Sequence, residues 1–162
     1  PNDGHKKNII DKVHNYAGIG YYLYGKQFRY YEEFIDRYLE FENIPLDVKV
    51  GDPCSITVKT NGKSFLYFLM VYHEMFPQEM TPSQIKKKVS YEDFSEDQYQ
   101  KIFAWDLSRY RNGTEYKIPL SFSKEGLYYI QIYTDKREIT KPGSMNTKGK
   151  TPYSGIVIKV SR

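Results

Sequence analysis

The sequence predicts a mostly β fold, an antiparallel β-sandwich, and three observations support this. Short runs in which apolar and polar residues alternate are separated by turn signals, as expected for strands with one buried face. The 162 residues include 17 Tyr and 9 Phe, residue types that favour strands. The chain is also 40% hydrophobic and 27% charged, a balance typical of a globular domain with a sizeable core.

The first 43 residues differ from the rest and are expected to form a short Tyr-rich extension. Residues 1–15 are polar apart from Ile9 and Ile10 and are interpreted as a tail or a short first element. Three glycines within residues 16–25 argue against a stable helix, so an extended or looped segment with exposed tyrosines is expected there.

Residues 27–42 carry apolar side chains at helical spacing, which predicts a helix of about four turns. Within this segment, the part from Arg37 onward, up to Ile44, fits a first strand equally well. The N-terminal extension is therefore predicted to be helical in part, with the alternative of a strand left open.

Clear alternation begins after residue 44. Residues 46–50 and 55–60 alternate between apolar and polar side chains, which predicts two strands. Asn61-Gly62 is the strongest short hairpin signal in the chain. Residues 65–72 follow it and are apolar on both faces, as expected of a central strand.

The next 25 residues or so interrupt this rhythm. Thr81, Pro82 and Gln84 match an N-cap, a first-turn proline and a capping-box glutamine. A short helix is therefore predicted up to about Val89, within a connection between strands.

The last third of the chain returns to period-two patterning. Strands are predicted over residues 99–107, 115–122, 127–134 and 155–160. The residues expected to point inward are Ile118, Leu120, Phe122, Tyr128, Ile130, Ile132, Ile156, Ile158 and Val160. Residues 135–154 are rich in Lys, Thr, Gly and Pro, lack an apolar period, and are predicted to form a long loop.

One stretch resembles the E strand, corner and F strand of immunoglobulin and fibronectin type III-like modules. Ile118-Pro119-Leu120 is followed by Gly126-Leu127-Tyr128, in which Tyr128 matches the tyrosine of the "G-x-Y" corner. The resemblance covers about residues 44–162 and implies an immunoglobulin-like antiparallel β-sandwich there. Residues 1–43 are expected to pack on this sandwich.

The module that this stretch resembles is one outside the antibody family, because the Cys…Trp…Cys pattern is absent and Cys54 is the sole cysteine. The pattern is similar to repeated domains of secreted or surface bacterial proteins. Cys54 shares strand parity with Ile56 and Val58, so it is interpreted as a small, buried apolar residue. No intrachain disulfide is possible.

Charge and motifs argue against several classes of function. The net charge of +4 comes from scattered basic residues, so nucleic acid is not an expected partner. His5, His14 and His73 lack chelating spacing, and no metal or other cofactor is expected. The acidic residues Glu92, Asp93, Glu96 and Asp97 lack EF-hand spacing and are interpreted as a solvated loop.

Catalytic motifs are also missing. Ser83 and Lys86 have Ser-x-x-Lys spacing, but the companion motifs of that enzyme class are absent, so Ser83 is interpreted as a residue of a helix's first turn. No pair of carboxylates is singled out for glycoside hydrolysis. The chain is therefore not expected to be an enzyme.

The first candidate binding surface is an aromatic group in the N-terminal extension. Tyrosine offers a flat apolar ring and a polar tip, which suits sugar stacking or protein contact. The group consists of Tyr16, Tyr21, Tyr22, Tyr24, Phe28, Tyr30 and Tyr31, of which Tyr21, Tyr22, Tyr24 and Tyr30 are the predicted ligand-binding residues. The alternative interpretation is that these rings pack across the sandwich as a lid.

The second candidate surface is the loop over residues 135–154, because loops longer than about 12–15 residues are often functional or disordered. It carries a net charge of +3, suited to an acidic polymer or partner. The predicted ligand-binding residues are Lys136, Arg137, Lys141 and Lys148. The alternative is a solvated loop without a binding role.

These observations favour a non-catalytic binding module of a secreted, periplasmic or cell-surface protein, with an unidentified protein or glycan as its partner. Two alternatives stay open: a carbohydrate-binding module that uses the Tyr-rich segment, and an accessory domain of a larger extracellular enzyme. No run of 18 apolar residues is present, so a transmembrane segment is not expected, although an anchor outside this chain fits the hypothesis. The chain is expected to be a monomer.

Overall fold

The computed structural model describes residues 3–89, 98–150 and 152–162. The chain divides into two compact units, Pro1–Tyr38 and Leu39–Arg162, and each is described by itself. The expected boundary after residue 43 falls one strand later than this division, because the strand Leu39–Glu42 pairs within the second unit.

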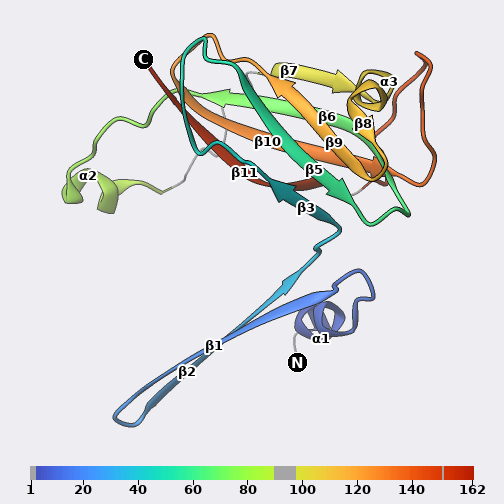
Figure 1. Cartoon of the computed structure of the whole chain (residues 1–162). Coiled ribbons are helices and arrows are strands. Elements are labelled where there is room, and N and C mark those ends of the chain that lie inside the picture. Colours follow the sequence, from blue (N-terminus) through green and yellow to red (C-terminus); the bar gives the residue numbers. More distant parts are fainter. Residues whose placement is uncertain (1–2, 90–97, 151) are drawn as a thin grey trace. The chain divides into compact units, whose positions relative to one another are not determined.

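The first unit consists of the helix α1 (Asp3–Ile10) and the strands β1 (Tyr16–Tyr24) and β2 (Gln27–Ile35). The two strands pair antiparallel from Tyr16–Ile35 to Tyr24–Gln27 without a bulge (Figure 1). Gly25 begins the two-residue connection with a φ of 57°, a conformation that glycine adopts without strain. We call β1, β2 and their turn, residues 16–35, the hairpin.

The helix predicted over residues 27–42 is wrong. Residues 27–35 form β2, and residues 39–42 form the strand β3 (Leu39–Glu42), so the strand alternative was right for the later part. Tyr and Phe are mediocre helix formers but good strand formers. Pairing with β1 satisfies the backbone of residues 27–35, which the helical spacing of their side chains does not reveal.

The second unit is built from two sheets, as predicted for a mostly β chain (Figure 1). The four-stranded sheet contains, in spatial order, β3, β5 (Cys54–Thr60), β9 (Glu115–Leu120) and β8 (Arg111–Asn112). The five-stranded sheet contains β4 (Asp47–Lys49), β11 (Pro152–Ser161), β10 (Gly126–Asp135), β6 (Phe65–Glu74) and β7 (Gln98–Phe103). Among the described strands of this unit, all pairs are antiparallel except β4 with β11.

The main core lies between these two sheets. It combines residues of β5 and β9 from one sheet with residues of β6, β10 and β11 from the other. All nine side chains predicted from the last third of the sequence to point inward are buried, with exposed fractions of 0–4%. Period-two patterning therefore identified this part of the core correctly. Cys54 is half-buried and packs at the margin of the core.

Asn61-Gly62 does not close a hairpin. Gly62 adopts a φ of 77°, as a turn requires, but β5 and β6 lie in different sheets. Residues 61–64 therefore carry the chain across the sandwich. A tight-turn signal reports the local backbone conformation, whereas the partner of each strand depends on where its apolar face is buried.

The strand predicted over residues 99–107 is shorter than expected. β7 ends at Phe103 and is followed by a single helical turn, α3 (Ala104–Leu107), and a 3₁₀ turn, η1 (Ser108–Tyr110). Ala104 and Leu107 are buried on this turn, and the Trp105 ring stacks on Phe103 with centroids 4.9 Å apart. The strand therefore ends at Phe103, because Ala104 and Leu107 are buried at helical rather than strand spacing.

The helix predicted after Thr81 is present as α2 (Pro82–Lys87). Thr81 accepts a hydrogen bond from the Gln84 backbone, and the Gln84 side chain accepts one from the Thr81 backbone, which is the reciprocal capping box expected from the sequence. Ser83 lies in its first turn, as predicted.

The corner before β10 has the hydrogen bond expected of a tyrosine corner. The Tyr128 hydroxyl donates to the backbone carbonyl of Lys124 at 2.9 Å, and the Tyr128 side chain is fully buried. Gly126 has a φ of 141°, and a Cβ there would lie 2.3 Å from the Glu74 carbonyl oxygen. This corner therefore requires glycine.

Candidate functional site

The regular register of the hairpin gives it two chemically different faces. Side chains of successive strand residues point to opposite sides, and directly paired residues point to the same side. We call one side the apolar face, which consists of Ala17, Ile19, Tyr21, Leu23, Phe28, Tyr30, Glu32 and Phe34. We call the other the glycine face, which consists of Tyr16, Gly18, Gly20, Tyr22, Tyr24, Gln27, Arg29, Tyr31, Glu33 and Ile35.

The apolar face exposes an unusual amount of hydrophobic side chain. Five of its six large hydrophobic members have exposed fractions from 55% to 78%: Ile19, Tyr21, Leu23, Phe28 and Tyr30. Contiguous exposed apolar patches of this kind typically mark interaction sites. Glu32 is the single charged side chain on this face of the hairpin, every residue of which the structure describes.

The four predicted tyrosines do not form one surface. Tyr21 and Tyr30 are direct cross-strand partners on the apolar face, whereas Tyr22 and Tyr24 lie on the glycine face. The Tyr22 and Tyr24 rings are nearly parallel, at an angle of 15°, with centroids 6.4 Å apart. The aromatic group predicted from sequence is therefore divided by strand parity.

A shallow depression in the hairpin is lined by four residues of the glycine face, Gly20, Tyr22, Arg29 and Tyr31, together with Tyr21 and Tyr30. A Cβ at Gly18 or Gly20 would meet nothing within 4 Å, and neither glycine has a positive φ. Glycine weakens a strand, and its usual reasons are a bulge, a bend or the close approach of a ligand. The hairpin register has no bulge here, so open space above the strand is what these glycines provide.

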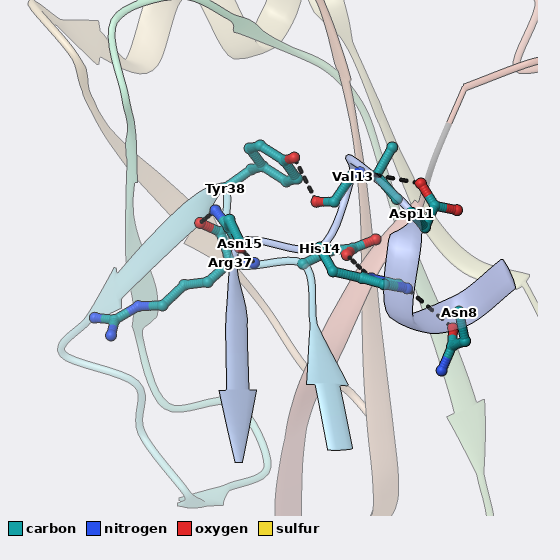
Figure 2. Close-up of polar contacts among 8 residues, drawn as sticks. Asn8, Asp11, Val13, His14, Asn15, Arg37 and Tyr38 are labelled. Carbon is teal, nitrogen blue, oxygen red and sulfur yellow. Dashed lines mark hydrogen bonds and ion pairs between the residues drawn. The ribbon is translucent and has the colours of Figure 1, made fainter. Parts of the chain in front are cut away.

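The open end of the hairpin is fixed by polar contacts (Figure 2). Asn15 acts as a clamp: its side-chain amide donates to the Arg37 carbonyl at 2.8 Å and accepts from the Arg37 backbone N–H at 2.7 Å. The Tyr38 hydroxyl donates to the Val13 carbonyl at 2.5 Å. The segments on either side of the hairpin are thereby held together.

His14 links the helix α1 to this end of the hairpin (Figure 2). Its ring nitrogens lie 2.6 Å from an Asp36 carboxylate oxygen and 3.0 Å from the Asn8 side-chain oxygen. The His14 ring also stacks on Phe34, with centroids 5.6 Å apart. This contact half-buries Phe34, whereas the other seven residues of the apolar face are exposed.

The second predicted surface, the loop after β10, is tied down at several points. Tyr67 accepts a hydrogen bond from the Asn146 backbone at 2.9 Å, and Lys150 forms an ion pair with Asp135. Lys150 also lies over the Tyr67 ring, 4.2 Å from its centroid. Because of the Lys150 ammonium, the pKa of Asp135 is below its ordinary value.

The same loop covers apolar residues on the outer face of the five-stranded sheet. Ile139 and Met145 pack against a second cluster that contains Tyr67, Phe68 and Met70. Across the sandwich, Glu138 pairs with Arg111 at 2.6 Å. The loop therefore has a structural role that its polar composition did not indicate.

The predicted basic residues of this loop, Lys136, Arg137, Lys141 and Lys148, are all exposed. The loop's two carboxylates, Asp135 and Glu138, are engaged by Lys150 and Arg111. The four predicted cations are thus left to face solvent, on a scaffold that is fixed at both ends.

His73 and Cys54 are residue types that enzymes often use, and both are engaged in the packing of the sandwich. His73 is buried and donates from Nε2 to the Glu125 carbonyl at 2.9 Å. Burial raises the pKa of the Cys54 thiol, which is opposite to the shift of a reactive thiolate. Across residues 3–89, 98–150 and 152–162, no three His, Cys, Asp or Glu side chains are arranged to hold a metal ion.

Two further sequence predictions concern an acidic group and membrane-spanning segments. The acidic residues Glu92, Asp93, Glu96 and Asp97 fall outside the described residues. Within the described part of the chain, no helix has the length and apolarity needed to cross a bilayer.

No protein-family model matches this chain, and no curated protein matches it.

Several residues of the hairpin surfaces were not among the binding residues predicted from the sequence. Ile19 and Leu23 complete the apolar face, and Gly20 and Arg29 line the depression on the other side. Two alternating segments flanking Gly25-Lys26 were the available signal, and the helical interpretation of residues 27–42 concealed it.

Proposed function

We propose that this chain is a non-catalytic binding module of a secreted or cell-surface protein, in which an immunoglobulin-like sandwich carries the hairpin as its interaction element. The single observation that carries the proposal is the apolar face, on which five large side chains are 55–78% exposed. Aromatic and large aliphatic side chains at the centre of an interface supply most of its binding energy. A protein partner suits a face with one charge in eight residues.

The strand order supports the immunoglobulin-like part of the proposal. The order β3-β5-β9-β8 corresponds to the A-B-E-D sheet of such domains. The order β11-β10-β6-β7 corresponds to G-F-C with an added C′ strand, with β4 pairing parallel to the last strand. The Tyr128 corner lies at the start of the strand that corresponds to F.

A site-specific cross-linker tests the protein-binding role. Replacing Phe28 by photoreactive benzoylphenylalanine places the probe on the apolar face, and the same probe at the exposed Val157 of β11 is the control. A protein captured at position 28 and not at 157 is then purified, and its affinity for the chain is measured.

The decisive comparison uses variants on opposite faces of the hairpin. The double variant Leu23→Thr/Phe28→Thr keeps strand-forming residues but removes apolar surface, and it should weaken binding at least about tenfold. Tyr22→Thr, on the glycine face, should bind as the wild type does. Equal affinity of wild type and double variant contradicts the proposal.

A second candidate function, carbohydrate binding, is favoured by the glycine face. Parallel tyrosine rings beside an open depression suit the stacking of a sugar ring, and Arg29, Gln27 and Glu33 supply polar groups on the same face. On a glycan array, Gly20→Thr should fill the depression and abolish retention while leaving the strand intact. Absence of retention by the wild type on every glycan rejects this candidate.

A further inference from the structure

We infer that the partner of the apolar face is a second copy of this chain, with two hairpins packed antiparallel, apolar face against apolar face. The inference rests on the proposed function, because it names the partner of the surface proposed there. It differs from the monomer expected from the sequence.

The size of the face fits a stable dimer. Aromatic side chains such as Tyr21, Phe28 and Tyr30 each offer about 150–250 Å² of surface. Together with Ile19 and Leu23, they are 55–78% accessible. Covering them removes on the order of 600 Å² per copy, or roughly 1,200 Å² for the pair, which exceeds the ~1,000 Å² expected of a biological interface. A smaller partial contact would leave part of this surface in water.

The stability of the hairpin also calls for an opposing layer. An isolated two-stranded hairpin is marginally stable in water, and a hydrophobic face needs a second layer to contribute. A second hairpin supplies such a layer with matching chemistry, because it presents the same apolar side chains. The Tyr21–Tyr30 row of one copy meets the Leu23–Phe28 row of the other in this arrangement.

The charges of the hairpin are complementary in the antiparallel arrangement. Glu32 lies opposite Ile19, one same-face step from the Tyr21–Tyr30 row toward the open end. Lys26 lies in the turn, just beyond the Leu23–Phe28 row. When the twofold axis passes between these two central rows, Glu32 of each copy faces Lys26 of the other. The single charge on the apolar face thereby gains a partner of opposite sign.

A charge-swap experiment on the whole chain tests this geometry by sedimentation equilibrium. Glu32→Lys and Lys26→Glu should each weaken self-association about tenfold, because each places like charges together twice in the dimer. An equimolar mixture of the two single variants should regain wild-type association, since every pair in the mixed dimer is again opposite in sign. The charge-swapped double variant Glu32→Lys/Lys26→Glu should also regain wild-type association.

The rescue by mixing separates contact between copies from contact within one copy, and circular dichroism verifies that each variant is folded. Val157→Thr, at an exposed position of β11, should dimerise as the wild type does. A wild type that stays monomeric up to high concentration overturns the inference, as does a dimer that is unaffected by Leu23→Thr/Phe28→Thr. If the wild type is monomeric but that double variant still loses a captured protein, self-association fails while the proposed function stands.

Discussion

The sandwich and the hairpin are built from similar strands but differ in what faces them. In the sandwich, apolar side chains from two sheets meet, and Ile56, Ile130 and Ile158 are at most 1% exposed. In the hairpin, Ile19 is 67% exposed although its strand is paired just as regularly. Backbone pairing therefore does not bury an apolar face, because burial requires a second layer. The exposed hairpin is where function is expected.

Matched leucines provide the sharpest test of this difference. Leu69→Ala in β6 should destabilise the sandwich by about 2–5 kcal/mol, because it leaves a cavity in a fully buried position. Leu23→Ala in the hairpin should change the free energy of unfolding of the sandwich by less than about 0.5 kcal/mol. Urea unfolding followed by near-ultraviolet circular dichroism measures both, and similar losses contradict the distinction.

Two glycines give the next largest contrast. Gly126→Ala should cost about 1–3 kcal/mol or more, because its Cβ would meet the Glu74 carbonyl and its φ of 141° disfavours alanine. Gly20→Ala meets open space and should strengthen the hairpin by about 0.5–1 kcal/mol. Thermal unfolding tests the first variant and hydrogen exchange of residues 16–35 the second. Faster exchange in Gly20→Ala argues that this glycine has a structural role.

Tyrosine hydroxyls distinguish the two regions by a single atom. Tyr128→Phe removes the hydrogen bond to the Lys124 carbonyl in a buried corner and should cost about 1–3 kcal/mol. Tyr21→Phe, at a position that is 78% exposed, should be neutral for stability. The comparison is made between the midpoints of urea unfolding curves, provided that the variants share the same dependence of the unfolding free energy on urea concentration. A neutral Tyr128→Phe indicates that the corner does not depend on this bond.

The smallest expected effect concerns the loop after β10 and its dependence on pH. The pKa of Asp135 is lowered in the folded protein by Lys150, so the pair stabilises the fold above the ordinary carboxyl pKa of about 3.9. This contribution is lost as the pH falls through the lowered value. Asp135→Asn should therefore cost about 1 kcal/mol or less at pH 7 and nothing in strong acid. A difference from wild type that persists at acidic pH contradicts the ion-pair origin.

Much of the sandwich was predictable because its local signals agree with its tertiary structure. The alternation around Ile118, Ile130 and Ile158 identified inward positions, and Thr81 with Gln84 identified the capped helix. Signals failed where local and tertiary preferences differ. Asn61-Gly62 predicted a hairpin, but the flanking strands bury their apolar faces from opposite sheets.

The candidate site was predicted in part. The sequence identified Tyr21, Tyr22, Tyr24 and Tyr30 as a group, but their division between two faces depends on the register of β1 with β2. The basic loop was recognised by its composition, whereas its attachment through Tyr67 and Lys150 brings together residues far apart in the chain. Composition carries no information on such contacts.

The sequence by itself determined the mostly β character, the inward positions of the later strands, the capped helix and the Tyr128 corner. Each of these depends on interactions within a few residues or on a two-residue period. The tertiary structure alone decided which strands share a sheet, that residues 27–35 are a strand, and which tyrosines share a face. Strand pairing is settled by residues far apart in sequence, and a shift of one residue moves every side chain to the other face.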